Sequence, residues 1–212
     1  MEASRAVEGL TIAGVVSAVL GAALTVCGAA LVMRPAPRVT PQALDAGTVP
    51  TAVGGPATHP AAADTGSPPV RLEIPDLRVR ARVLPVGVRP DGTLEVPPSA
   101  RDLGWWRGGA APGSATGTVV IAGHVDTARE GPGALFGLRG VRMGGRINVR
   151  SADGRTRDYR IVARRAYPKQ RLPHSVFAQD SPARLVLITC TGSFDRRTSS
   201  YSHNLVVYAQ PD

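Results

Sequence analysis

The sequence predicts a mostly-β fold, a closed barrel of about eight strands with short helices. Composition favours it, because Gly and Pro, 24 and 19 of the 212 residues, destabilise helix interiors and are common in turns. Short β-branched runs separated by turn residues recur from residue 70 onward. About eight such runs fit a sheet that closes on itself.

The chain begins with a short tail, residues 1–9, and an uncharged apolar segment, residues 10–33. At about 1.5 Å rise per residue, this segment is long enough to cross a hydrocarbon core of about 30 Å. We therefore expect one uncleaved transmembrane helix. A secretion signal is the alternative, although its apolar region usually has only about 7–15 residues. The flanking charges, Arg5 against Arg34 and Arg38, slightly disfavour export of the C-terminal part.

Residues 34–69 form the next segment, which is rich in Pro, Ala, Thr and Gly and contains no aromatic residue. Such a stretch buries too little apolar surface to offset its ordering entropy, so we expect a disordered linker. All nine aromatic residues of the chain lie between Trp105 and Tyr208. The aromatic residues therefore indicate that the folded domain occupies residues 70–212.

Within this domain, alternation of apolar residues with arginine after residue 79 is typical of a strand with one solvent-facing side. The uniformly apolar runs 118–123 and 184–190 indicate strands buried on both faces. Asp-Gly turns at 90–92 and 152–154 predict hairpins, and a short helix is expected near 133–139. The expected strands cover residues 70–74, 79–88, 93–96, 118–123, 146–150, 157–165, 184–190 and 204–209.

The domain is strongly basic, with 22 Lys and Arg against 12 Asp and Glu, in a chain of net charge +9. Every basic residue except Lys169 is arginine. The charges are dispersed and match no nucleic-acid-binding motif, so we expect no nucleic-acid partner. Anionic wall polymers or lipid headgroups are the favoured neighbours, and a merely solvated basic surface is the alternative.

The sequence gives no sign of a metal or cofactor. Its two cysteines are too few for a disulfide scaffold or a Cys-rich zinc site, and Cys27 lies within the apolar segment. The His, Asp and Glu residues lack zinc or calcium spacing, and no Gly-rich phosphate loop precedes a helix. We therefore expect that the protein needs neither a metal nor a cofactor.

The residues that could carry chemistry lie at the ends of two apolar strands. His124 follows the run 118–123, and Cys190 ends the run 184–190. A thiolate can attack a carbonyl, and an imidazolium can stabilise the thiolate or protonate the leaving amine. The pair predicts thiol acyl transfer, against the alternative that both side chains are simply packed.

The two motifs resemble those of a known family. Residues 117–127 (GTVVIAGHVDT) and 185–195 (LVLITCTGSFD) resemble the histidine and cysteine motifs of the sortases, the membrane-anchored cysteine transpeptidases of Gram-positive bacteria. Residues 105–106, 111–113, 131–136 and 201–209 are similar to the class F branch found in actinobacteria. The resemblance implies an eight-stranded sortase barrel on the outer side of the cell membrane.

The resemblance also implies a reaction. Cys190 would attack the Thr-Gly bond of an LPXTG-like sorting signal, and His124 would act as general acid and base. An amine of a cell-wall precursor would then take the acyl group from the thioester. The alternative is a sortase-fold surface protein that binds sorting signals or wall polymers without turnover. An L,D-transpeptidase is disfavoured, because its Ser-x-Gly-Cys signature is absent.

One position departs from the family pattern. Sortases carry an arginine near the start of the final strand, where this chain has Ser, His and Asn at 202–204. Arg196 and Arg197 follow the cysteine closely, and we select Arg197 as the residue that stabilises the oxyanion or the substrate. Asp126 is expected either to orient His124 or to cap the following loop.

Overall fold

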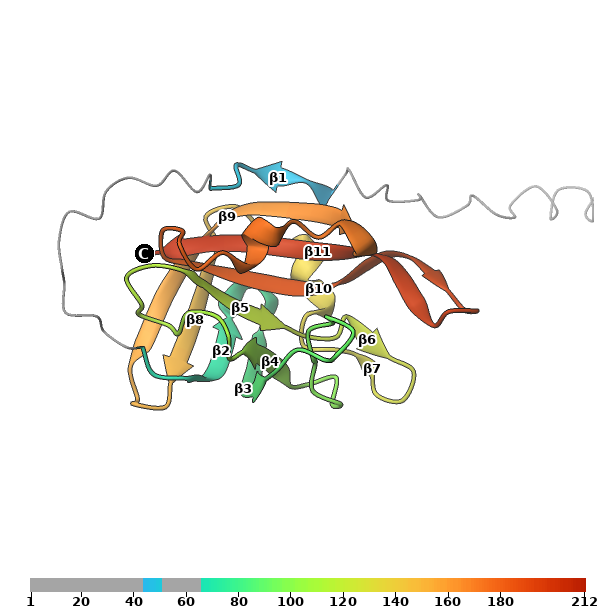
Figure 1. Ribbon diagram of the computed structural model, residues 1–212, viewed down its shortest axis with the longest axis horizontal. Coiled ribbons are helices and arrows are strands. Elements are labelled where there is room, and N and C mark those ends of the chain that lie inside the picture. Colours follow the sequence, from blue (N-terminus) through green and yellow to red (C-terminus); the bar gives the residue numbers. More distant parts are fainter. Residues whose placement is uncertain (1–43, 51–65) are drawn as a thin grey trace, which may run out of the picture. The chain divides into compact units, whose positions relative to one another are not determined.

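The computed structural model describes residues 44–50 and 66–212 (Figure 1). The expected N-terminal tail and transmembrane helix, residues 1–9 and 10–33, lie outside the described residues. Among the residues that are described, no helix has the length and apolar character needed to cross a membrane.

Eight strands form a barrel in the order β9-β11-β10-β5-β4-β3-β2-β8, which closes because β8 also pairs with β9. Most neighbours are antiparallel, whereas β10 with β5 and β3 with β4 are parallel. The predicted closed barrel is confirmed. Its strands are β2 (Pro69–Ile74), β3 (Val79–Val86), β4 (Leu103–Trp106), β5 (Thr118–Ala122), β8 (Arg146–Ser151), β9 (Thr156–Pro168), β10 (Arg184–Asp195) and β11 (Ser200–Pro211).

The remaining elements are short. Two-residue strands β6 (Asp126–Thr127) and β7 (Gly131–Pro132) pair with each other. Within residues 66–212 the 3-10 helices are η3 (Pro75–Leu77), η4 (Phe136–Gly140), η5 (Lys169–Arg171) and η6 (His174–Phe177). The helix expected near 133–139 is therefore the single turn η4.

Seven of the eight expected strands form, and one does not. Residues 93–96 make only an isolated bridge, between Leu94 and Val88. The missing place in the barrel is taken by β4, whose sequence LGWW lacks β-branched residues and alternation. Both Asp-Gly turns form, with Gly92 and Gly154 at φ of 81° and 84°, a conformation that favours glycine.

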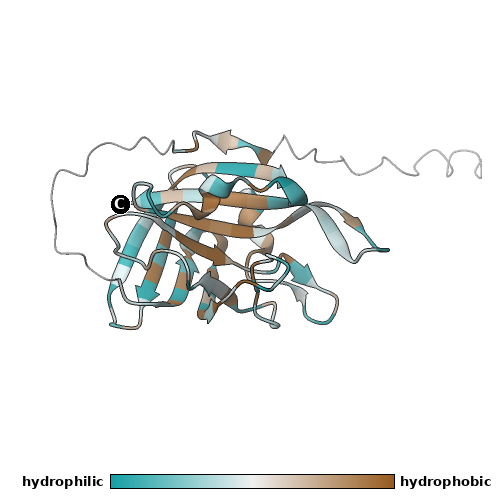
Figure 2. Cartoon of the chain, in the orientation of Figure 1, coloured by the Kyte–Doolittle hydropathy of each residue, from teal (hydrophilic) through white to brown (hydrophobic). Residues whose placement is uncertain are grey.

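Two apolar clusters, one on each side of the sheet, explain the uniformly apolar strands. Along β10, Leu185 and Leu187 belong to the cluster inside the barrel, and Val186 and Ile188 to the cluster on its outer face. The outer cluster also contains Val176 and neighbouring residues of the connection between β9 and β10. Figure 2 shows the resulting hydrophobic stretches of β5, β10 and β11. Because both faces are covered there, β5 is apolar at each position of 119–122 and β10 at each position of 185–188.

Part of the expected linker packs on the barrel. Strand β1 (Ala46–Gly47) pairs with β9, and Leu44 is only 8% exposed. Arg164 donates to the carbonyl of Leu44, and Arg165 donates to the carbonyls of both β1 residues. Composition reflects apolar surface only, whereas here two guanidinium groups hold this segment by its backbone carbonyls. The rest of the linker up to residue 65 lies outside the described residues.

A glycine fixes how β5 leaves the core toward the candidate site. A Cβ atom added at buried Gly123 would overlap the Cδ2 atom of Leu103, which is fully buried. We predict that Gly123→Ala lowers the free energy of unfolding by about 1–3 kcal/mol, because the packed neighbour has no room to move. Denaturant unfolding of the full chain measures the change.

The matched control is Gly140→Ala, since a Cβ atom at Gly140 meets nothing within 4 Å and its φ is not positive. This variant should stay within about 0.5 kcal/mol of the parent. Equal effects of the two substitutions would refute the steric account of Gly123.

Candidate active site

The parallel pairing of β5 with β10 places His124 and Cys190 at the same level. The register runs from Thr118 beside Arg184 to Ala122 beside Ile188. It continues by one residue, because Gly123 N–H donates to the carbonyl of Ile188 at 3.0 Å and the Thr189 hydroxyl donates to the carbonyl of Gly123 at 2.8 Å. Extended past Ala122, the last residue of β5, this register aligns His124 with Cys190, and adjacent strands are about 4.8 Å apart.

Both residues also lie on the same side of the sheet. Side chains alternate along a strand, so Cys190 shares a face with Val186 and Ile188, which belong to the outer cluster. His124 likewise follows Val120 and Ala122 of that cluster. The candidate site is therefore the polar continuation of the outer apolar face, at the point where the strands leave the core.

The His124 ring is oriented by the segment that precedes β4. Its Nε2 atom lies 3.1 Å from the carbonyl oxygen of Pro97, and the side chain is half-buried. Because a carbonyl oxygen only accepts, Nε2–H is the donor in this contact. In this position Nδ1 is the ring nitrogen left to exchange a proton with a substrate.

Burial and charge act in opposite directions on the Cys190 thiol. Burial raises the pKa of Cys190 most, the positive charge of Lys169 lowers it, and the negative charge of Asp126 raises it further. Cys190 is a free thiol that remains partly exposed. A thiol in this setting reacts well only if a neighbouring cation stabilises its thiolate.

Asp126 takes neither of the two roles expected for it. It lies in β6, and its Oδ2 atom accepts a hydrogen bond from the Tyr201 hydroxyl at 2.6 Å. This hydrogen bond is the main reason why the pKa of Tyr201 is raised to about 12. The pair joins the loop after His124 to the start of β11, and so closes one side of the candidate site.

Lys169 is the cation that the structure brings near the thiol. It opens η5, directly after β9, whose residue Pro168 pairs with His203 of β11. Its Nζ atom donates to the Ser200 hydroxyl at 2.7 Å. Lys169 is the single lysine of the chain, but no motif or spacing in the sequence predicts it as a site residue.

Arg197 lies at the tip of the β10–β11 hairpin, which extends beyond the barrel (Figure 1). Its side chain is exposed, and its backbone N–H donates to Asp195. Asp195 lies five residues beyond Cys190 on β10, about 16 Å along an extended strand. In this conformation Arg197 makes no hydrogen bond with Cys190, and the role of Arg197 stays a prediction that requires the hairpin to fold over the site.

The positions where sortases carry an arginine hold a small polar pair. Ser202 Oγ and His203 Nδ1 are 2.8 Å apart, and the backbone N–H of Ser193 donates to Ser202. Gly192, in the bulge opposite, has a φ of 87° and leaves no room for a Cβ atom beside Ser202. These positions therefore carry no permanent positive charge.

A metal site is not part of this arrangement. Across residues 44–50 and 66–212, no group of three or more His, Cys, Asp or Glu side chains could hold a metal ion. The chemistry available is that of a thiol and an imidazole on adjacent strand ends, with an ammonium group nearby. Such a set can form and resolve a covalent acyl intermediate.

Comparison with known proteins finds a family model and several solved structures. The family model of the sortase domain matches residues 72–212. No match was found among curated protein sequences.

Solved structures with the same fold include three sortases. The chain is similar to sortase A from Corynebacterium diphtheriae, with 21% identity and a TM-score of 0.51 over 69% of this chain and 61% of that one. Similarity to sortase C2 of Group B Streptococcus Pilus Island 1 is at 17% identity and a TM-score of 0.52, over 67% of this chain and 72% of that one. Similarity to sortase C-1 from Actinomyces oris is at 21% identity and a TM-score of 0.51, over 67% of this chain and 72% of that one. At these identities the likeness shows the fold alone.

Removing either of the two charges near the thiol should shift the pKa of Cys190, and the two shifts should have opposite signs. Lys169→Met should raise the pKa of Cys190, because it removes the positive charge that lowers it. Asp126→Asn should lower the pKa of Cys190, because it removes a negative charge that raises it. The rate of thiol alkylation against pH reports this pKa, so the two profiles should move in opposite directions.

The control is Arg89→Gln, which removes an exposed charge next to the turn at residues 90–92. Its alkylation profile should coincide with that of the parent protein. A shift of the same sign in the Lys169 and Asp126 variants would contradict the electrostatic account.

Proposed function

The chain belongs to the sortase family, and we propose that it is a membrane-anchored cysteine transpeptidase of the class F type. The observation that carries this proposal is the parallel register of β5 with β10, which aligns His124 with Cys190 when it is extended by two residues. Sortases act through a cysteine, and the family model covers both residues. The proposed substrate is a surface protein with an LPXTG-like sorting signal, and the proposed location is the outer side of the cell membrane.

The first half of the proposed reaction forms a thioester. The Cys190 thiolate attacks the carbonyl carbon of the signal threonine, and the tetrahedral intermediate then breaks the Thr-Gly C–N bond. His124 gives a proton to the departing glycine amine. The acyl group remains on the sulfur atom, which retains much of the energy of the cleaved bond.

The second half transfers the acyl group. An amine of a cell-wall precursor attacks the thioester carbonyl, His124 takes the proton from that amine, and the thiolate leaves. Burial raises the pKa of Cys190, so its thiolate needs a neighbouring cation. In the proposed reactive form that cation is the His124 imidazolium. The ion pair is used up when the glycine amine leaves with the proton, and it forms again when His124 takes a proton from the acceptor amine and the thiolate leaves.

Lys169 supplies the positive charge that the family's arginine would otherwise supply. The chain has Ser202 and His203 where that arginine is expected, whereas the charge of Lys169 already acts on the thiol. An ammonium group in this place also favours the oxyanion of the tetrahedral intermediate. We keep Arg197 as the rival source of this charge, through movement of its hairpin.

A non-catalytic sortase-fold protein is the second candidate function. The missing arginine at 202–204 favours it, because a binding protein needs no oxyanion stabilisation. The two functions differ in one observable, since only the enzyme forms a covalent acyl adduct on Cys190.

The direct test incubates the full chain with an LPXTG peptide and an amine acceptor. We expect cleavage, an acyl adduct on Cys190 by mass spectrometry, and loss of both in Cys190→Ala. His124→Ala should lower kcat/KM by about 100-fold or more. His174→Ala, which changes an exposed side chain of η6, is the matched control and should retain activity. Binding of the peptide without any adduct would contradict the enzyme and support the second candidate.

A second prediction separates the two cations. Lys169→Gln should lower kcat/KM for the peptide by about tenfold or more, the scale expected when a transition-state charge loses its partner. Arg197→Gln should remain within about twofold, because Arg197 lies at the hairpin tip and its charge, unlike that of Lys169, is not among those that shift the pKa of Cys190. The reverse pattern would assign the charge to Arg197 and refute the role of Lys169.

A further inference from the structure

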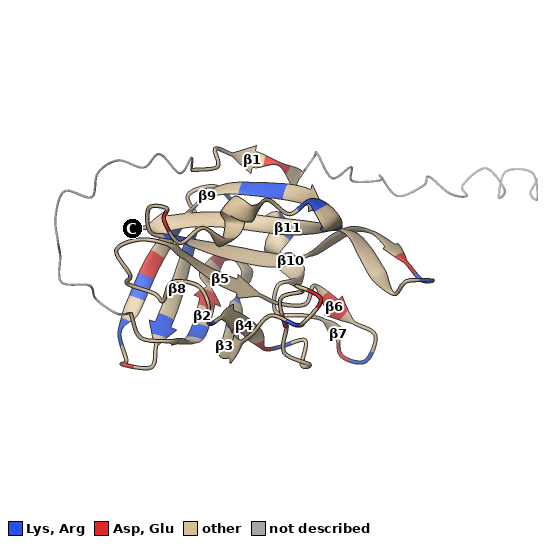
Figure 3. Ribbon diagram, in the orientation of Figure 1, with Lys and Arg blue, Asp and Glu red and all other residues tan. Residues whose placement is uncertain are grey.

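On one face of the barrel, some arginines have acidic partners and others do not. Strands β3, β2, β8 and β9 are neighbours, and their outward residues line up in rows across the sheet. Figure 3 shows basic positions on adjacent strands in this region. Comparing the rows shows where acidic partners are missing.

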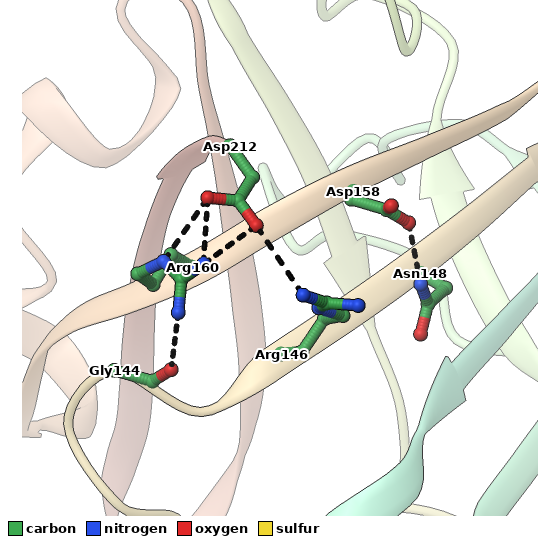
Figure 4. A network of polar contacts seen from close by, with 6 residues as sticks. All are labelled: Gly144, Arg146, Asn148, Asp158, Arg160 and Asp212. Atoms are coloured by element: carbon green, nitrogen blue, oxygen red, sulfur yellow. Dashed lines mark hydrogen bonds and ion pairs between the residues drawn. The ribbon is translucent and has the colours of Figure 1, made fainter.

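Two of the rows are balanced. In one, Arg80 pairs with Glu73 at 2.8 Å, and Asn148 donates to Asp158. In the next, Arg160 makes a two-pronged contact with Asp212, which also lies 3.8 Å from Arg146. Figure 4 shows the contacts among the residues of β8, β9 and Asp212. Each carboxylate here has a hydrogen-bonding or cationic partner.

The third row consists of three arginines side by side. Arg71 of β2 lies directly opposite Arg82 of β3 on one side and Arg150 of β8 on the other. Arg82 binds both carboxylate oxygens of Asp102. Arg71 and Arg150 have no acidic partner among the described residues, and both are exposed.

This arrangement costs stability in the absence of an anion. Residues directly opposite on neighbouring strands have Cα atoms about 4.5–5.5 Å apart. Like charges in such positions repel each other and destabilise the pairing. A doubly charged oxyanion between the two guanidinium groups would reverse the sign of this interaction, since guanidinium binds phosphate through paired hydrogen bonds.

The surface is also hollowed at this row. A hollow of about 460 Å³ is lined by Arg71, Glu73, Arg80, Asn148, Arg150 and Thr156. The Arg80–Glu73 ion pair forms part of the lining, so the net positive charge of the hollow comes from Arg71 and Arg150. The volume is ample for a phosphate group and the polymer units beside it.

We propose that Arg71 and Arg150, flanked by Arg82, bind phosphate groups of a flexible anionic polymer. The row crosses three strands, about 10 Å in all, which suits successive anionic groups on one chain. A single flexible chain can enter a hollow, whereas the headgroups of a flat bilayer contact the residues that protrude from a protein surface. The observations therefore favour a polymer over a lipid surface.

The hollow is separate from the candidate active site. Around the barrel, β3 and β4 separate β2 from β5, and β9 and β11 separate β8 from β10. A polymer held at Arg71 and Arg150 would leave His124 and Cys190 free. The proposal thus concerns where the protein is retained and does not depend on the reaction.

The test measures binding of a fluorescent linear polyphosphate to the full chain by anisotropy. We expect binding that weakens as salt is added, and Arg71→Gln/Arg150→Gln should lower the affinity by at least about tenfold. Arg89→Gln/Arg139→Gln removes the same charge from two other exposed positions and should change the affinity less than about twofold. Without polyphosphate, the Arg71/Arg150 variant should unfold at the same or a higher temperature, because the repulsion is relieved.

Three outcomes would overturn the proposal. One is no binding by the parent protein, and another is an equal loss of affinity in the two double variants, which would mean net charge alone. The third is stronger binding of phosphatidylglycerol vesicles than of polyphosphate through the same arginines, which would mean a lipid surface. Cleavage of the LPXTG peptide by the Arg71/Arg150 variant should be unchanged, so failure here and failure of the proposed reaction are distinguishable.

Discussion

The parallel pairing of β5 with β10 is the constraint on which the candidate site depends. It aligns two residues that lie 66 positions apart in the chain and gives them a common face. Parallel neighbours require apolar cover on both sides, and the two clusters supply it. The reactive side chains follow directly where that cover ends, so a well-packed core and an accessible thiol are features of the same two strands.

Much of this could be predicted from the sequence, because strong local patterns coincide with the barrel. The apolar runs before His124 and Cys190 predicted both buried strands. Strand β4 was missed because its LGWW sequence has no strand pattern of its own and is held by neighbours on both sides. The docking of Leu44 was missed because it depends on guanidinium groups of β9, 120 residues away.

The surroundings of the thiol were the least predictable part of the site. Lys169, Asp126 and Tyr201 come from the end of β9, the loop after β5 and the start of β11. No spacing rule links them, and only the closed sheet brings them together. The charges of Lys169 and Asp126 oppose each other in their effect on the buried thiol, and neither follows from the sequence around Cys190.

The central claim is that residues 124 and 190 lie side by side on one face, and an engineered disulfide tests it most directly. In a chain with Cys27→Ser, we expect His124→Cys to form a bond with Cys190 under mild oxidation, because aligned Cα atoms on adjacent strands fall within the range of about 4.4–6.8 Å that disulfides need. Val125→Cys, one residue further along the chain, should not form this bond. Cross-linking that is absent at 124, or equal at 124 and 125, would contradict the account.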